Sequence, residues 1–186
     1  LFFNDGIQTV IVASSLYSTN ELGMETSQVL MTFLVTQFVA IAGALLFGKM
    51  AARMGAKKAV LVGLAIWLAV VATGFLMPKH NFGALIALGA AIGLVMGGTQ
   101  ALSRSLYSQL IPLGKESEYF SFYQAMERGT SWLGTLAFGL VYQFSGSYRL
   151  ALVALMIFFV VGGVLLSRVN IKQGILDAGN ALPKVI

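Results

Sequence analysis

Seven polar or charged side chains interrupt the apolar stretches of this sequence, and their chemistry is the first clue to a function. They carry amide, hydroxyl, carboxyl and guanidinium groups: Asn4, Asp5, Gln8, Thr9, Gln100, Glu127 and Arg128. Such groups can hydrogen-bond a small polar solute, and a carboxyl group can also carry a proton through an apolar region. The sequence therefore predicts a substrate or proton pathway, with Asp5 and Glu127 as the candidate proton carriers.

Glu127 and Arg128 need partners if they lie inside an apolar bundle. They stand about eight residues into a predicted helix, roughly 12 Å from its start, and adjacent helical residues point about 100° apart. Because an unpaired Arg within a membrane is costly, we expect Arg128 to pair with Asp5 first, or with Glu127 second. The alternatives are an interfacial position for Asp5 and a purely structural pair of Glu127 and Arg128.

The residue types argue against other chemistries. The sequence has no Cys and a single His, which excludes disulfides and thiolate zinc sites and argues against a histidine-based metal site. It also has no phosphate-binding loop, nucleophile elbow or glycosidase-type pair of carboxylates. We therefore expect no enzymatic activity, no catalytic residues, no cofactor and no metal.

Composition points to a membrane protein. Hydrophobic residues make up 58% of the 186 residues and charged residues only 10%, against about 25% charged residues in a soluble domain. A short soluble fold cannot hide so much apolar sequence, and a disordered chain needs the opposite composition. The net charge of +5 comes from basic clusters between apolar runs, as in membrane loops. We therefore expect the lipid bilayer and a small-molecule substrate as partners, and no nucleic acid.

The uncharged stretches are long enough for helices that cross a bilayer, since about 20 apolar residues are needed. We predict an all-α integral membrane bundle over residues 1–168, with six helices at about 1–18, 28–50, 58–77, 82–106, 119–144 and 148–168. A polar cytoplasmic tail over 169–186 is expected to be poorly ordered. Gly89, Gly93 and Gly97 recur every four residues, which predicts close contact between helices.

The Lys and Arg residues predict an orientation. Nine of them fall on one side of the six predicted spans, whereas only Lys79 and Arg149 fall on the other. Basic residues are enriched in cytoplasmic loops. Both chain ends are therefore expected in the cytoplasm.

The loop after the second predicted span carries a recognisable motif. Residues 48–58 read GKMAARMGAKK, which resembles the signature loop of the major facilitator superfamily, G-x-x-x-D-R-x-G-x-[RK]-[RK]. The matching residues are Gly48, Arg53, Gly55, Lys57 and Lys58. In the family the first Gly lets a helix end pack closely, and the basic residues anchor the cytoplasmic face. Ala52 replaces the usual Asp, which puts a charge-relay role in doubt, and a generic basic membrane loop is the alternative.

Further stretches narrow the resemblance. Residues 4–9 (NDGIQT), 97–105 (GGTQALSRS), 111–112 and 118–123 together are similar to the C-terminal half of the vacuolar amino-acid effluxer family, an autophagy-related branch of that superfamily. The resemblance implies that the six spans are helices seven to twelve of a twelve-helix carrier. The missing N-terminal six-helix half would then be a partner of this chain.

The same resemblance implies a function. It implies secondary active transport of a small solute by alternating access, with amino acids as the candidate substrates and a proton gradient as the candidate energy source. The membrane would be a bacterial inner membrane, or a vacuolar membrane in a eukaryote. The alternative is a non-transporting polytopic membrane protein, such as a receptor, scaffold or assembly subunit.

Overall fold

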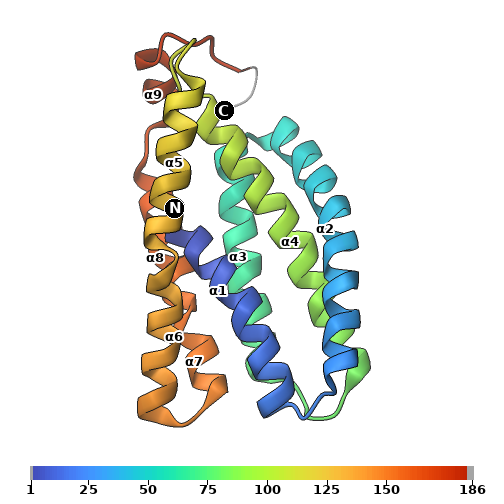
Figure 1. Ribbon diagram of the computed structural model, residues 1–186. Coiled ribbons are helices and arrows are strands. Elements are labelled where there is room, and N and C mark those ends of the chain that lie inside the picture. Colours follow the sequence, from blue (N-terminus) through green and yellow to red (C-terminus); the bar gives the residue numbers. More distant parts are fainter. Residues whose placement is uncertain (1, 184–186) are drawn as a thin grey trace.

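The computed structural model describes residues 2–183, and every regular element among them is a helix (Figure 1). The elements are α1 (Phe2–Leu16), the π-helical turn η1 (Tyr17–Glu21), α2 (Thr26–Met54), α3 (Ala56–Phe75), α4 (Phe82–Ser108), α5 (Glu116–Thr130), α6 (Trp132–Ser145), α7 (Tyr148–Ala154), α8 (Met156–Arg168) and α9 (Ile171–Asp177). The prediction of an all-α membrane bundle is confirmed. Position 1 of the first predicted span and positions 184–186 of the predicted tail lie outside the described residues.

Four helical stretches within the described residues are long and apolar enough to cross a membrane. They are Thr26–Met54, Ala56–Phe75, Phe82–Ser108 and Tyr148–Arg168, the last being α7 and α8 taken together. The first predicted span contains the shorter helix α1, which widens into the π-helical turn η1. The fifth predicted span, 119–144, is divided at Ser131 into α5 and α6.

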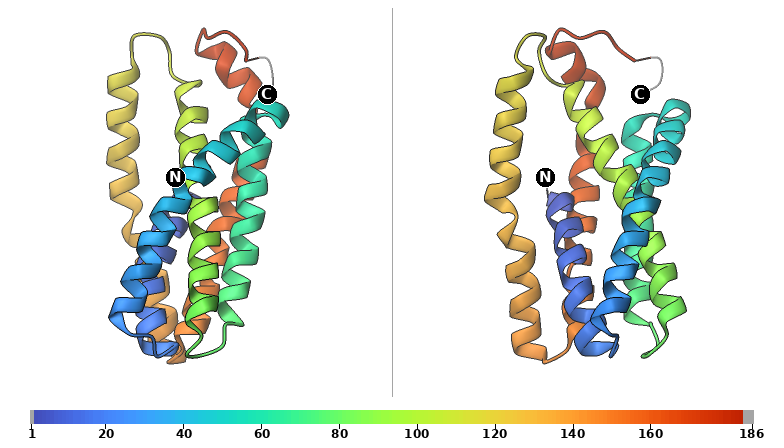
Figure 2. Two further views of the ribbon diagram at one scale, coloured as in Figure 1. Left: turned by 90° about the vertical axis from the view of Figure 1, so that its right-hand side faces the viewer. Right: turned by 45° about the vertical axis from the view of Figure 1, so that its right-hand side comes forward.

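The helices form two groups that pack against each other. α4 packs between α2 and α3, while α1 packs against α6 and α8, and α3 joins the groups by packing on α8 (Figure 2). At that junction the Trp67 ring of α3 stacks on Phe159 of α8, with ring centroids 5.3 Å apart. The Trp67 Nε1 also donates a hydrogen bond of 3.3 Å to Thr99 Oγ1 of α4. α5 buries none of its residues and therefore stands at the side of the bundle.

Backbone contact holds α2 against α4. A Cβ atom added at Gly93 would overlap the backbone of Thr36, and one at Gly97 would overlap the backbone of Ala40. Gly43 of α2 meets the backbone of Leu94 in the same way. Small residues let membrane helices approach this closely, so the glycine repeat of α4 has the packing role that its spacing predicts.

The signature loop is a single-residue turn. Gly55 ends α2 and precedes α3, and its φ of +90° is a conformation that favours glycine. Gly48, in contrast, is exposed on α2, and a Cβ there would meet open space. The close packing that the motif led us to expect at Gly48 is thus absent within the described chain.

Part of the predicted tail is folded, which corrects the expectation of a poorly ordered segment. α9 buries Ile171 and Ile175, which cluster with Leu106 of α4. The Asn180 amide also donates to the carbonyl oxygens of Gln109 and Ile111, at 3.0 and 2.7 Å. The tail was predicted to be polar, but Ile171 and Ile175 recur at helical spacing and supply an apolar face.

An arginine ties three connections together at the opposite end of the bundle. Arg149 Nη1 and Nη2 donate to the carbonyl oxygens of Phe75 and Met77, at 3.0 and 3.1 Å. These carbonyl groups lie at the end of α3, where the helix has no further backbone N–H groups to pair with them. Its Nε lies 3.3 Å from Glu21 Oε1, and Lys79 Nζ lies 3.6 Å from the same oxygen. The planar guanidinium therefore links the connections that follow α1, α3 and α6.

The glycine contact predicts unequal effects of one substitution at two sites. Gly97→Ala should lower the free energy of unfolding by about 1–3 kcal/mol, because the added methyl group overlaps a neighbouring backbone. Gly48→Ala should leave it unchanged or raise it by up to about 1 kcal/mol, because alanine favours helices and the site is open. Thermal unfolding of the purified protein measures both, and equal shifts would contradict the contact.

The arginine link predicts a similar contrast at the other end. Arg149→Gln should lower the free energy of unfolding by about 1.5–3 kcal/mol, since hydrogen bonds from a charged donor are lost. Lys79→Gln should cost less than about 1 kcal/mol, because the Lys79 side chain is 57% exposed. The same unfolding assay applies, and a Lys79 effect as large as that of Arg149 would refute the link.

Candidate functional site

Two polar contacts join α1 to α5. The Asn4 side-chain amide donates to Glu127 Oε1. One turn further along α5, Thr130 Oγ1 lies 3.2 Å from Asp5 Oδ1. The Thr130 hydroxyl also lies 2.9 Å from the carbonyl oxygen of Met126, so its single proton is shared between two acceptors. The polar residues of α1 and α5 therefore form one cluster.

Asp5 is the most enclosed member of this cluster. Its side chain belongs to a residue that is only 1% exposed, and Oδ2 has no hydrogen-bond partner within residues 2–183. No Lys or Arg side chain of the described chain forms an ion pair with it. A buried carboxylate without a counter-charge is costly, whereas its protonated form is much less so. The Asp5 carboxyl group is therefore a place where a proton can be held.

The break between α5 and α6 lies beside this cluster. The first described turn of α1 lies about halfway along the bundle, next to the α5–α6 junction (Figure 1). Hydroxyl groups of Thr130 and Ser131 bond back to the carbonyl oxygens of Met126 and Arg128, both at 2.9 Å, a pattern that bends helices. Beyond the junction Gly134 lets α6 approach α1 closely. The cluster thus lies beside an interrupted helix, about halfway along the bundle.

A polar hollow of about 390 Å³ opens in front of the cluster. Side chains from α1, α4 and α5 line it together with the junction residue: Gln8, Arg104, Gln124, Glu127, Arg128 and Ser131. It therefore presents two guanidinium groups, one carboxyl group, two amides and one hydroxyl group. Such a surface can bind a small molecule that carries both a negative and a positive charge.

The structure brings together most of the predicted site residues but not in the predicted pairs. Arg128 is exposed toward the hollow and pairs with neither Asp5 nor Glu127, so that prediction is wrong. Glu127 is instead turned toward Asn4, and the adjacent Arg128 points elsewhere on the helix. Thr9 is buried and donates to the Asp5 carbonyl oxygen at 2.8 Å, which serves α1 itself.

Other residues were misplaced or missed. Gln100 is half-buried on α4 and does not line the hollow. Arg104 does line it, near the end of α4, although it was not among the predicted site residues. Thr130 was also missed as a site residue. The sequence feature that could have identified it is its position on the predicted helix, one turn after Met126 and two residues after Arg128.

The signature loop lies apart from the polar cluster. Arg53 and Lys58 are exposed, while Lys57 Nζ donates to the carbonyl oxygens of Ser167 and Val169, both at 2.8 Å. Lys57 therefore holds the end of α8, where carbonyl groups lack helical partners. Residues 2–183 contain no group of three His, Asp or Glu side chains that could hold a metal ion.

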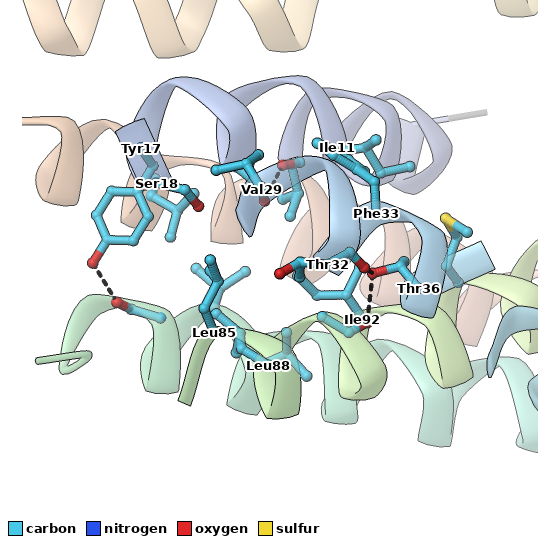
Figure 3. A pocket seen from close by; sticks show the side chains of 18 of the residues that line it. Ile11, Tyr17, Ser18, Val29, Thr32, Phe33, Thr36, Leu85, Leu88 and Ile92 are labelled. Carbon is cyan, nitrogen blue, oxygen red and sulfur yellow. Dashed lines mark hydrogen bonds between the residues drawn. The ribbon is translucent and has the colours of Figure 1, made fainter. Parts of the chain in front are cut away.

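A second pocket lies between α1, α2, α3 and α4 and is mainly apolar (Figure 3). Its hydroxyl groups are turned to backbone carbonyl oxygens. Tyr17 donates to Gly74 at 2.7 Å, and Thr36 donates to Thr32 at 2.8 Å or to Gly89 at 3.0 Å. None of the predicted site residues lines this pocket. It offers apolar surface and few free polar groups, so the polar hollow remains the candidate site.

Comparisons with known proteins agree with this picture. The chain is 33% identical over 168 residues to the uncharacterized MFS-type transporter YxiO of Bacillus subtilis, covering 90% of this chain and 39% of that protein. It is 31% identical over 186 residues to autophagy-related protein 22 of Kluyveromyces lactis, covering 94% and 37%. Against the protein of that name from Saccharomyces cerevisiae, identity is 28% over 185 residues, with 94% and 35% covered.

The chain thus spans about two-fifths of the length of these curated relatives. No solved structure matches it. The family described as "Vacuole effluxer Atg22 like" matches residues 1–179, nearly the whole chain. With its long apolar helices and these relatives, the chain is a multi-pass membrane protein and belongs to the vacuole effluxer Atg22-like family.

Proposed function

We propose that the chain forms one half of a secondary transporter that moves a small zwitterionic solute, of which an amino acid is the simplest case. The observation that carries the proposal is the polar hollow beside an interrupted helix, halfway along an otherwise apolar bundle. Transporter sites are commonly built from broken helices near the middle of the membrane. The family description and the relatives' names support the same class of function.

The charges of the hollow suit such a solute. A guanidinium group can bind a carboxylate through two parallel hydrogen bonds, which suits Arg104 and Arg128. The Glu127 carboxyl group, on the same wall, suits an ammonium group. A solute with only one charge would leave part of the wall unpaired.

Proton coupling follows from the second layer of the site. When protonated, Asp5 can donate to Thr130 Oγ1 while that hydroxyl donates to the Met126 carbonyl oxygen. When ionised, Asp5 accepts from Thr130 instead, and Oδ2 lacks a partner. Asn4 ties Glu127 into the same cluster, so binding at the hollow and protonation at Asp5 act on one set of hydrogen bonds. This shared set is how we propose that solute and proton movement are coupled.

The other wall of the pathway would come from a second bundle. Five of the six residues that line the hollow are exposed, and the chain spans about two-fifths of its relatives' length. We propose an N-terminal six-helix half as the partner, with alternating access by rocking of the two halves. A scaffold or receptor is the alternative, but such a protein gains nothing from a buried carboxyl oxygen that lacks a partner.

Transport by the full-length protein in liposomes tests the proposal. Asp5→Asn should abolish accumulation of an amino acid driven by an imposed pH gradient, while exchange of labelled for unlabelled substrate continues, because only the proton step is removed. Glu127→Gln should weaken both processes at least tenfold, since one removed charged hydrogen bond contributes about that factor to binding.

Glu118→Gln, on the same helix but outside the hollow, is the matched control and should behave as wild type. The 186-residue chain alone should show no saturable flux, because it supplies only one wall. Wild-type accumulation by both Asp5→Asn and Glu127→Gln would overturn the proposal, and so would saturable flux by the isolated chain.

We also propose that the end of the bundle bearing the signature loop faces the cytoplasm, on the basis of the uneven distribution of basic residues. Single cysteines at Lys57 and Thr19 should then react with a membrane-impermeant maleimide from opposite sides, and the one at Lys57 only after the cell membrane is opened. The chain has no Cys of its own. Labelling of position 57 in intact cells would reverse the orientation.

A further inference from the structure

Four basic side chains surround a hollow at the end of the bundle that carries the signature loop. The hollow measures about 360 Å³ and lies between the start of α3 and the connection from α8 to α9. Its basic residues are Lys57, Lys58, Arg168 and Lys172. None of them belongs to the polar hollow between α1, α4 and α5, so this is a separate place on the molecule.

These cations have no compensating charge within the described chain. No Asp or Glu lines the hollow, and the two ion pairs among residues 2–183 both involve Glu21, in the connection after α1. Lys57 is fixed by its hydrogen bonds to two carbonyl oxygens at the end of α8. The other three side chains belong to exposed residues and are free to converge on a ligand. An anion bound among them would relieve their mutual repulsion.

The start of α3 adds to the positive field. Its N-cap, Gly55, supplies no side-chain hydrogen bond, so backbone N–H groups of the first turn remain unpaired. Two lysines stand in that turn, where the helix dipole already favours negative charge and disfavours cations. The hollow therefore combines four side-chain cations with the positive end of a 20-residue helix.

An apolar hollow of about 310 Å³ adjoins the basic one. The two share Val169 and Ile171 in their walls, and the apolar one continues to Leu106, Leu110 and Leu166. A ligand that fills both needs an anionic head and a hydrocarbon chain. The basic hollow lies where the apolar helices α3 and α8 start and end, the level at which lipid headgroups meet a membrane protein. The apolar hollow extends from there to Phe3, at the start of α1.

We propose that this pair of hollows is a binding site for one anionic phospholipid. Its phosphate and headgroup contact Lys58, Arg168 and Lys172 and the start of α3, and an acyl chain enters the apolar hollow beside Leu110. By bridging α3, α8 and α9, the lipid neutralises the basic cluster and fastens the folded tail to the bundle.

Native mass spectrometry of the full-length protein, titrated with dioleoyl phosphatidylglycerol, tests the site. The double variant Lys58→Gln/Lys172→Gln removes two exposed cations and leaves Lys57 in place. We expect its binding of phosphatidylglycerol to weaken about 30-fold, because each basic residue near an anionic lipid contributes about a fivefold factor. The matched control, Arg53→Gln/Lys115→Gln, removes two exposed cations outside the hollow and should bind as wild type.

Three further measurements sharpen the result. Dioleoyl phosphatidylcholine, which carries no net charge, should bind at least tenfold more weakly than phosphatidylglycerol to the wild type. Glycerophosphoglycerol and inorganic phosphate, which lack acyl chains, should not compete with the lipid at millimolar concentration. Thermal unfolding without lipid should be the same in both double variants, which shows that each is folded.

Equal weakening in the two double variants would overturn the proposal in favour of diffuse surface charge. Effective competition by inorganic phosphate would overturn it in favour of a soluble anion. Neither outcome depends on transport, so the lipid site and the proposed function fail or succeed separately.

Discussion

Direct backbone contact between α2 and α4 is the interaction on which the rest of the bundle depends. Inside a bilayer apolar side chains gain nothing by leaving lipid for protein, so helices associate through close packing instead. Gly43, Gly93 and Gly97 remove the side chains that would hold the two backbones apart. α3 then covers the other side of α4, and the stacking of Trp67 on Phe159 attaches the group of α1, α6 and α8. α5 is left at the edge with no buried residue.

That arrangement explains where the candidate site lies. Since α5 is not enclosed by the other helices, one of its faces opens to the polar hollow while the Glu127 and Thr130 side chains reach α1. Among residues 2–183, neutral donors rather than a Lys or Arg side chain approach the two carboxyl groups. Asp5 thus stays buried with an oxygen that lacks a partner, a costly state that the packing of α1 against α6 and α8 maintains.

The two ends of the bundle use charge differently. After α1, α3 and α6, Arg149 and Lys79 are matched by Glu21 and by carbonyl oxygens, and the end is closed by its own contacts. At the signature loop, Lys57 is the only cation with a partner among the described residues, the carbonyl oxygens at the end of α8. The remaining cations face outward, so this end relies on anions from its surroundings. The contrast follows the uneven distribution of basic residues that membrane proteins commonly show.

The amino-acid sequence was sufficient to predict the structural class, an all-α membrane bundle. Apolar runs of about 20 residues allow only helices in a bilayer, because every backbone polar group must be satisfied within its own segment. Composition, glycine spacing and the motifs around residues 48–58 and 97–105 therefore predicted the all-α membrane bundle, the close packing of α4 and the family. They also identified Asn4, Asp5 and Glu127 as unusual, because polar groups in apolar runs are costly and need a reason.

The contacts between these polar groups, in contrast, are known only from the fold. Opposite charge suggested that Arg128 pairs with Asp5, but side-chain direction on α5 turns Glu127 toward Asn4 and leaves Arg128 in the hollow with Arg104. The break at Ser131 and the burial of Ile171 and Ile175 of α9 against Leu106 could not be predicted either, since each depends on which helix lies opposite. Periodicity and hydropathy describe one segment at a time, whereas a site is made by segments that are distant in the chain.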